Sequence, residues 1–189
     1  MTLGFMQRFK WKGPDGQPEP TNFREKILAG VQNASIDQKF VSVPVSAPEL
    51  EAIGLKNPKL YFPIQPKLHT IREDKPNRWK AGRKIEMVYR GAGYSIVDHF
   101  NKGIPELEKC VSVQLIHLWW TALAKTQDER DRNVGHQLKL NCIVDGKRLN
   151  DQELTTLAIN DGFTSLDQFK RWFSKDFYGK IIHWTSLKY

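Results

Sequence analysis

The sequence predicts an α+β fold, in which a small mixed β-barrel is flanked by short helices and interrupted by an irregular insertion. Three observations support this prediction. The second half of the chain repeatedly alternates apolar and polar residues, which is the pattern of half-buried strands. Two segments in that half begin with residues that cap helices. Residues 31–65 show neither pattern, because prolines divide them into short apolar segments.

The N-terminal part is predicted to contribute one strand and one helix. Residues 5–11 alternate weakly and indicate the strand. Thr21 or Asn22 is expected to cap a helix over residues 23–29, and Gly30 suits the position just past the helix end.

We interpret residues 31–65 as an insertion that packs on the main body. Its prolines exclude a regular interior strand, but it is too apolar for a disordered linker. Burial is expected in particular for Phe40, Tyr61 and Phe62, and one or two helical turns are expected around residues 49–53.

Several strands of similar length are predicted after the insertion, and together they suggest the barrel. Asp145-Gly146 is typical of a tight hairpin turn, and residues 91–103 and 124–137 are predicted loops. The predicted strands cover residues 68–72, 85–90, 110–120, 138–144 and 180–184.

Two short helices are predicted before the last strand. Asn150 with Glu153, and Ser165 with Gln168, form capping-box patterns ahead of apolar residues. The connection between these helices is short, so it holds Asp161 at a fixed corner.

Length and composition predict one domain that covers residues 1–189, because 40% hydrophobic residues are enough for one core. No apolar run approaches the roughly 20 residues of a membrane span, and the N-terminus lacks the apolar stretch of a signal peptide. We therefore expect a cytoplasmic protein without a membrane partner. Cys110 and Cys142 lie in apolar strand patterns, which indicates buried thiols rather than a disulfide.

The formal net charge of +8 and the isoelectric point near 9.5 favour an anionic partner, and nucleic acid is the commonest such partner. Positive charge is concentrated in residues 72–84, where Glu73 and Asp74 are the neighbouring acidic residues. We predict that this run binds nucleic acid. Its residues are Arg72, Lys75, Arg78, Trp79, Lys80, Arg83 and Lys84. Trp79 is either a stacking surface for a base or a core tryptophan, and the pattern leaves both readings open.

Lys67, Thr70 and Asp161 form a candidate catalytic set. A desolvated lysine can act as a base, a threonine hydroxyl can act as nucleophile or donor, and a carboxylate can orient either group. Alternatively, they are a solvated lysine, an ordinary strand residue and a turn residue. No metal or other cofactor is expected, because the histidines are scattered and no cysteine pair has ligand spacing.

The order of these pieces resembles the ASCH domain family. The matching pieces are Lys26–Gly30, the Lys-x-x-Thr-Ile-Arg strand at Lys67–Arg72, the turn at Trp79–Gly82 and the corner at Asn160–Phe163. The resemblance implies a β-barrel related to the PUA RNA-binding domain, whose cavity and basic surface bind RNA or nucleotides. Because phage and prophage genomes contain many such proteins, it also implies a phage-type protein.

Within this family, the chain is similar to the small bacterial N4-acetylcytidine amidohydrolases. The matching segments are Gln7–Phe9, Ile27–Gly30 and Lys67–Arg72. The resemblance places the catalytic lysine and threonine at Lys67 and Thr70, and the catalytic glutamate near Asp161. The chain departs from the pattern in two ways: aspartate is shorter than glutamate by a methylene, and the insertion directly precedes the catalytic strand.

The leading hypothesis is a protein that binds RNA or a modified nucleoside in a cavity, with its phosphates on the basic run. In its enzymatic version, the N4-acetyl amide of acetylated cytidine is hydrolysed: Thr70 attacks the carbonyl, Lys67 takes the proton and Asp161 orients the pair. One alternative is a ribonuclease that uses the same basic cleft. Another is a phage interaction protein that binds a host protein without catalysis. The oligomeric state is left open.

Overall fold

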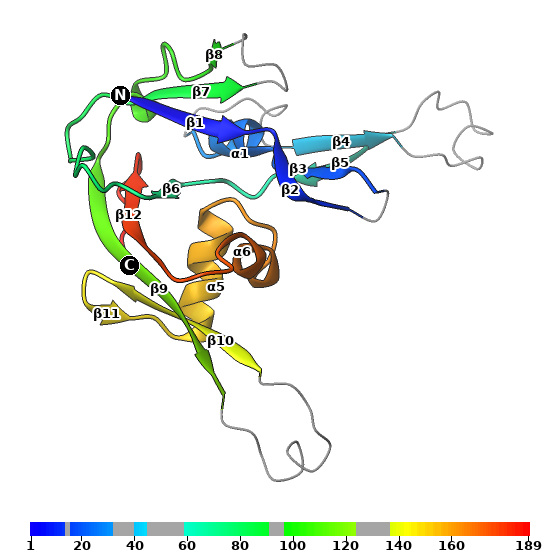
Figure 1. The fold of residues 1–189 in the computed structure, drawn as a ribbon. Coiled ribbons are helices and arrows are strands. Elements are labelled where there is room, and N and C mark those ends of the chain that lie inside the picture. The colour runs from blue at the N-terminus through cyan, green and yellow to red at the C-terminus, as the bar shows by residue number, and fades with distance from the viewer. Residues whose placement is uncertain (14–15, 32–39, 45–58, 91–96, 124–136) are drawn as a thin grey trace. The chain divides into compact units, whose positions relative to one another are not determined.

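The computed structural model describes residues 1–13, 16–31, 40–44, 59–90, 97–123 and 137–189 (Figure 1). These residues form two compact units. Unit 1 comprises Met1, Leu68–Ile85 and Gly103–Tyr189, and unit 2 comprises Thr2–Lys67 and Glu86–Lys102. Among the described helices, none has the length and apolar character that crossing a membrane requires.

Unit 1 is built around a five-stranded antiparallel sheet. Its strands, in spatial order, are β11 (Lys147–Arg148), β10 (Leu138–Val144), β9 (Ser112–Ala122), β12 (Phe177–His183) and β6 (His69–Arg72). Asp145 and Gly146 adopt positive φ angles of 48° and 85°, which suit a type I′ turn and confirm the predicted hairpin between β10 and β11.

The helices of unit 1 begin at the predicted caps. They are α5 (Asp151–Asn160) and α6 (Leu166–Trp172), with a short 3-10 helix, η1 (Pro105–Leu107), before β9. The Asn150 side chain accepts the Glu153 backbone N–H, and the Glu153 carboxylate accepts the Asn150 N–H at 2.9 Å, so the capping box of α5 is complete. Ser165 caps α6 by accepting the Gln168 N–H at 3.1 Å.

The two faces of the sheet differ, because successive side chains of a strand point to opposite sides. Ile116 and Leu118 of β9 belong to the packed face and are fully buried. Trp120 also lies on this face, and its indole N–H donates to the carbonyl of Phe173, just after α6, at 2.9 Å.

The opposite side, hereafter the open face, carries Leu115, His117 and Trp119 of β9. Register places Tyr178 of β12 opposite His117, and Lys180 of β12 opposite Leu115. Leu115, His117 and Tyr178 are exposed, so this part of the sheet is accessible to a ligand.

Unit 2 contains one helix and three small sheets in its described residues. The strands are β1 (Thr2–Met6), β7 (Glu86–Arg90) and β8 (Val97–His99) in the first sheet, β2 (Arg8–Lys12) and β3 (Pro18–Pro20) in the second, and β4 (Phe40–Pro44) and β5 (Lys59–Pro63) in the third. The helix is α1 (Phe23–Ala29), as predicted. Its Phe23 ring packs edge-on against Phe5 and Phe9, with centroids 6.4 and 5.8 Å away.

The predicted α+β class is confirmed, but the described strands form separate sheets and no closed barrel. The prediction of a single strand over residues 5–11 was wrong, because β1 ends at Met6 and β2 begins at Arg8. The prediction of a loop over residues 91–103 was wrong at β8, which gains hydrogen bonds by pairing with β7. The prediction of a single domain stays a prediction.

The insertion is more regular than the sequence suggested. β4 and β5 pair antiparallel from Phe40 opposite Pro63 to Pro44 opposite Lys59. Both prolines occupy strand ends, where the missing N–H disturbs the ladder least. The expected turns at residues 49–53 and most of the predicted loop at 124–137 lie outside the described residues. The side chains expected to be buried in this insertion also lie outside them.

Both cysteines are free and buried, which confirms the prediction. Burial raises the pKa of the Cys142 thiol to about 12, so the thiol stays protonated at neutral pH and unreactive.

Candidate nucleic-acid interface

The basic loop, residues 73–84, is held on the sheet by a buried ion pair. The Asp74 carboxylate accepts two backbone N–H groups of the loop at 2.8 and 2.9 Å, and it lies 3.0 Å from the Lys180 ammonium of β12. Lys180 also donates to the Trp79 carbonyl at 2.9 Å and to the Asn77 side-chain oxygen. Since an ammonium has three N–H donors, all of them are used inside the loop.

The electrostatics of Asp74 keep this pair charged. Burial alone would raise the pKa of the Asp74 carboxyl, but hydrogen bonds from Trp79, Arg78 and Lys180 outweigh burial and hold the pKa below its ordinary value. The loop is therefore anchored throughout the neutral pH range.

The basic residues predicted to bind nucleic acid lie together in unit 1, and most are exposed. Arg72 is half-buried, whereas Trp79 is only 3% exposed. Burial of Trp79 favours the core reading over the stacking reading, because a buried ring offers no face to a base. The exposed members are Lys75, Arg78, Lys80, Arg83 and Lys84.

The candidate catalytic residues lie in different units. Thr70 and Asp161 belong to unit 1 and are 2% and 4% exposed. Lys67 belongs to unit 2, where its ammonium lies 4.6 Å from the centroid of the Phe23 ring. Grouping of all three in one site therefore stays a prediction.

Asp161 occupies the helix-end position expected from the sequence. It is the C-cap of α5, and Gly162 follows it with a φ of 89°. Burial lowers the pKa of the Arg72 guanidinium, while the Asp161 carboxylate opposes that shift. Arg72 and Asp161 therefore influence each other electrostatically within unit 1.

An aromatic row crosses the open face. We use this name for the rings of Tyr178, His117 and Trp119 together with the guanidinium of Arg148. The Tyr178 and His117 centroids are 6.0 Å apart, and the His117 and Trp119 rings stack at 5.1 Å with an interplanar angle of 29°. The Arg148 guanidinium lies 5.9 Å from the Trp119 ring. Three strands, β12, β9 and β11, thus contribute π surfaces and a cation to one line.

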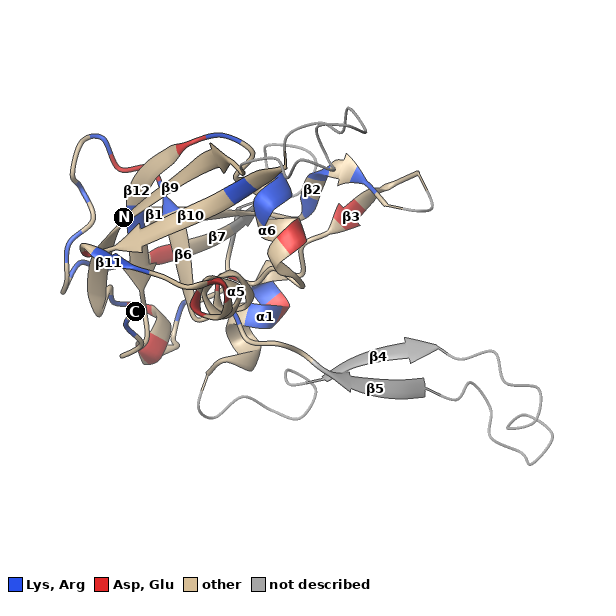
Figure 2. Cartoon of the chain, turned by 90° about the horizontal axis from the view of Figure 1, so that it is seen from below, with Lys and Arg blue, Asp and Glu red and all other residues tan. Residues whose placement is uncertain are grey.

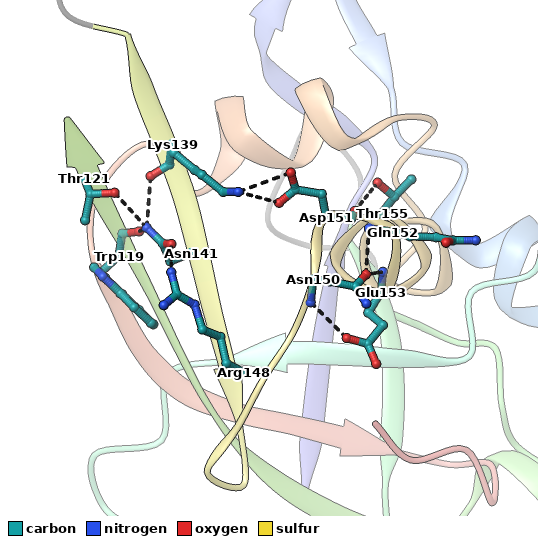
Figure 3. Close-up of polar contacts among 10 residues, drawn as sticks. All are labelled: Trp119, Thr121, Lys139, Asn141, Arg148, Asn150, Asp151, Gln152, Glu153 and Thr155. Carbon is teal, nitrogen blue, oxygen red and sulfur yellow. Dashed lines mark hydrogen bonds and ion pairs between the residues drawn. The ribbon is translucent and has the colours of Figure 1, made fainter. Parts of the chain in front are cut away.

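The Arg148 end of this row is fixed by polar contacts (Figure 3). Arg148 donates to the Asn141 side-chain oxygen at 2.7 Å, and Asn141 donates to the Thr121 hydroxyl at 3.0 Å. Nearby, Lys139 of β10 is paired with Asp151 of α5 at 3.0 Å. Figure 2 shows the basic positions of β11 and the acidic positions of α5.

A shallow pocket of about 420 Å³, the strand pocket, is lined by Lys139, Asn141, Arg148 and Asp151 and reaches the start of α5. Asn150 also lines it and already caps the first backbone N–H groups of the helix. This end of the row therefore presents paired charges and amides rather than an unneutralised positive helix end.

A second pocket connects the basic loop to the aromatic row. This loop pocket has a volume of about 430 Å³. Its residues include Glu73, Lys75 and Asn77 of the loop and Leu115, Tyr178 and Lys180 of the strands. Because Tyr178 belongs to both features, the pocket and the row are continuous.

A His–Tyr cluster, formed by the buried His69 and His183 and the half-buried Tyr189, lies on the packed side of the same sheet. The two histidines pair across β6 and β12 with ring centroids 5.3 Å apart, and the Tyr189 ring lies 5.4 Å from His69. The Tyr189 hydroxyl accepts a hydrogen bond from the Asn160 amide at 3.0 Å. Burial raises the pKa of Tyr189 well above its ordinary value, so this hydroxyl is neutral.

His183 is one of the two fully buried members of this cluster. Within the described part of the chain, neither of its ring nitrogens has a hydrogen-bond partner. Burial lowers its pKa to about 4, while Asp145 acts in the opposite direction and Lys188 lowers it further. The ring is neutral at pH 7 and serves as a packed core group.

Most of the aromatic row was not predicted from the sequence. The adjacent Trp119 and Trp120 lie on opposite sides of the sheet, as the register of β9 requires. The signal that could have revealed the row was the alternation of Leu115, His117 and Trp119 with fully apolar neighbours on β9.

No group of three His, Cys, Asp or Glu side chains in the described residues is placed to hold a metal ion. Comparisons with known proteins identify no relative: no family model matches the chain, and neither a curated protein nor a solved structure matches it. Membership of the ASCH family therefore stays a prediction.

Proposed function

We propose that the protein binds single-stranded RNA across the open face of its five-stranded sheet. The observation that carries this proposal is the aromatic row. Two exposed rings and the half-buried Trp119, with a cation at one end, supply stacking surfaces of the kind on which single-stranded nucleic acids bind. Tyr178 is 64% exposed, a large value for an aromatic side chain that would otherwise favour burial.

The charge distribution supports the same ligand. Lys75 lines the pocket that contains Tyr178, and the other exposed cations follow it in the same loop, so phosphates can contact the loop while bases contact the rings. Single strands are favoured over duplexes, because stacking on a protein ring requires an unpaired base. The resemblance to the ASCH family favours RNA over DNA and extends the proposal to a PUA-like barrel of phage type.

Amide hydrolysis is supported less well than binding. Thr70 and Asp161 are nearly inaccessible, and Lys67 belongs to the other unit. The amidohydrolase, ribonuclease and host-protein hypotheses therefore stay predictions from the sequence.

Fluorescence anisotropy with a labelled single-stranded RNA of ten nucleotides tests the proposal. Stacking contributes roughly 1–3 kcal/mol per base, so the double variant Tyr178→Ala/His117→Ala is expected to bind at least about tenfold more weakly. The matched control is Leu138→Ala/His99→Ala, which removes an exposed apolar side chain and an exposed histidine elsewhere. Equal affinities of the two double variants would contradict the proposal.

The salt dependence tests the contribution of the basic loop. Replacing Arg78, Lys80 and Arg83 with Ala is expected to flatten the log–log salt slope by roughly 0.7 for each phosphate that the variant no longer neutralises. Lys10, Lys12 and Lys102 are exposed lysines of unit 2 and provide the control triple variant. If both triple variants keep the wild-type slope, the phosphates bind elsewhere.

A further inference from the structure

We infer that the strand pocket binds one backbone phosphate of the bound RNA through the guanidinium of Arg148. The inference rests on the proposed RNA binding and adds a second phosphate site, at the end of the aromatic row opposite the basic loop. Three features carry it: the unneutralised charge of Arg148, the contacts that orient its guanidinium, and its place on the open face.

The strand pocket carries one positive charge in excess. Its cations are Lys139 and Arg148, and its carboxylate is Asp151. Lys139 lies 3.0 Å from Asp151, so these two charges neutralise each other. Within the described part of the chain, no carboxylate pairs with Arg148, whose polar partner is the neutral amide of Asn141. One excess cation matches the single negative charge of a phosphodiester, whereas the loop pocket has as many carboxylates as lysines.

The guanidinium of Arg148 is oriented by two neighbours (Figure 3). It donates to the Asn141 side-chain oxygen at 2.7 Å, and its central carbon lies 5.9 Å from the centroid of the Trp119 ring. Asn141 is 5% exposed and donates to the Thr121 hydroxyl at 3.0 Å, which keeps its oxygen turned toward Arg148. The planar fork of an arginine has more N–H donors than this one contact uses, so donors remain for the two oxygens of a phosphate.

The register of the sheet places Arg148 on the same face as the rings. Across β10, Arg148 of β11 is aligned with His117 of β9, and directly opposed residues of neighbouring strands share a face. Lys147 is aligned instead with Ile116 of the packed face, and its ammonium lies 2.7 Å from the Glu153 carboxylate. The two adjacent cations of β11 therefore differ, because Lys147 is neutralised and Arg148 is available to a ligand.

An RNA strand on the open face can thus contact phosphate-binding groups at both ends of the aromatic row. Tyr178 lies at the loop pocket, Arg148 lies at the strand pocket, and the rings of His117 and Trp119 lie between them. Bases that stack on these rings leave their phosphates free to bind the cations on either side.

The test replaces each β11 cation in turn and measures the binding of a labelled ten-nucleotide single-stranded RNA at several salt concentrations. Arg148→Gln is expected to bind roughly tenfold more weakly and to flatten the log–log salt slope by roughly 0.7, because one phosphate is no longer neutralised. Lys147→Gln removes the same charge from the adjacent residue, so it is the matched control and should keep the wild-type slope and an affinity within about twofold.

A third variant separates charge from geometry. Arg148→Lys retains the charge but not the fork, so it should keep the salt slope while losing part of the affinity. Both cations are exposed, so none of these substitutions is expected to impair folding.

Equal affinities and equal slopes of Arg148→Gln and Lys147→Gln would overturn the inference. A weaker affinity of Arg148→Gln with an unchanged slope would also overturn it, because Arg148 would then act only by supporting the Trp119 ring. If Tyr178→Ala/His117→Ala weakens binding while Arg148→Gln does not, the proposed function holds and this inference fails. If the wild-type protein binds no RNA, both fail together.

Discussion

Two groups of similar residue types lie on opposite faces of one sheet and differ in burial. The aromatic row places a histidine and a tyrosine in solvent, whereas the His–Tyr cluster places two histidines in the core beside a half-buried tyrosine. Both use β12, and the row also uses β9 while the cluster uses β6. The parity of a residue along the strand therefore decides whether its ring becomes a binding surface or a packing element.

Because the two groups differ in burial, they are expected to affect different properties: the buried rings affect folding stability, and the exposed rings affect ligand binding. A buried imidazole must stay neutral, so it couples folding to pH, whereas an exposed ring contributes little to folding and keeps its face for a ligand. We expect substitutions in the cluster to change stability and substitutions in the row to change affinity.

The largest expected effect is the acid destabilisation caused by His183. Its pKa is about 4 in the folded chain against an ordinary 6.5, so the unfolded chain binds the proton more readily. Stability from the neutral ring is complete above pH 6.5 and is lost as the pH falls from 6.5 through 4, by roughly 3 kcal/mol. Urea unfolding of the wild type and of His183→Phe between pH 7 and pH 4 measures this loss.

His183→Phe is expected to lose less stability than the wild type over this pH interval. The groups that act on His183 are His69, Tyr189, Asp145 and Lys188, and the variant retains all of them, so the comparison isolates His183. Identical pH dependence in the two proteins would show that the ring is solvated.

A smaller effect is expected from His117 on the open face, and it concerns affinity. His117→Ala should weaken RNA binding by about 1–3 kcal/mol through loss of a stacking surface. His117→Phe retains a ring and should bind nearly as well as the wild type. Both variants should unfold within about 0.5 kcal/mol of the wild type, because surface substitutions rarely change stability more. If His117→Ala lost stability but kept its affinity for RNA, His117 would be a packing residue, and the assignment of RNA binding to the open face would be contradicted.

The smallest expected effect compares two tyrosine hydroxyls. Tyr189→Phe removes the acceptor of the Asn160 amide and should cost about 1 kcal/mol of stability. Tyr178→Phe removes an exposed hydroxyl and should leave stability unchanged. Thermal unfolding of the two variants measures the contrast, and equal melting temperatures would contradict it.

Local features of the fold were predictable from the sequence. The caps of α5 and α6 depend on residues three positions apart, and the alternation of β9 lies within one segment, so each could be recognised without tertiary information. Strand β8 and the pairing of β4 with β5 could not, because their hydrogen bonds come from partners outside the segment. Whether a barrel closes depends on such non-local pairing as well.

The same distinction applies to the candidate site. Exposure of the basic loop followed from its composition, but the burial of Trp79 depends on the Asp74–Lys180 pair, which joins two distant segments. The aromatic row requires the register of β12 on β9, which brings Tyr178 opposite His117. No pattern within either strand contains that information.

An NMR titration of the aromatic side chains with single-stranded RNA tests the central claim most directly, because it observes both groups of rings in one sample. We predict that the ring signals of His117, Trp119 and Tyr178 shift on addition of RNA, while those of His183 and Tyr189 stay in place. Shifts confined to His183 and Tyr189, or the absence of any shift at RNA concentrations that saturate binding, would contradict the assignment of the open face as the RNA-binding surface.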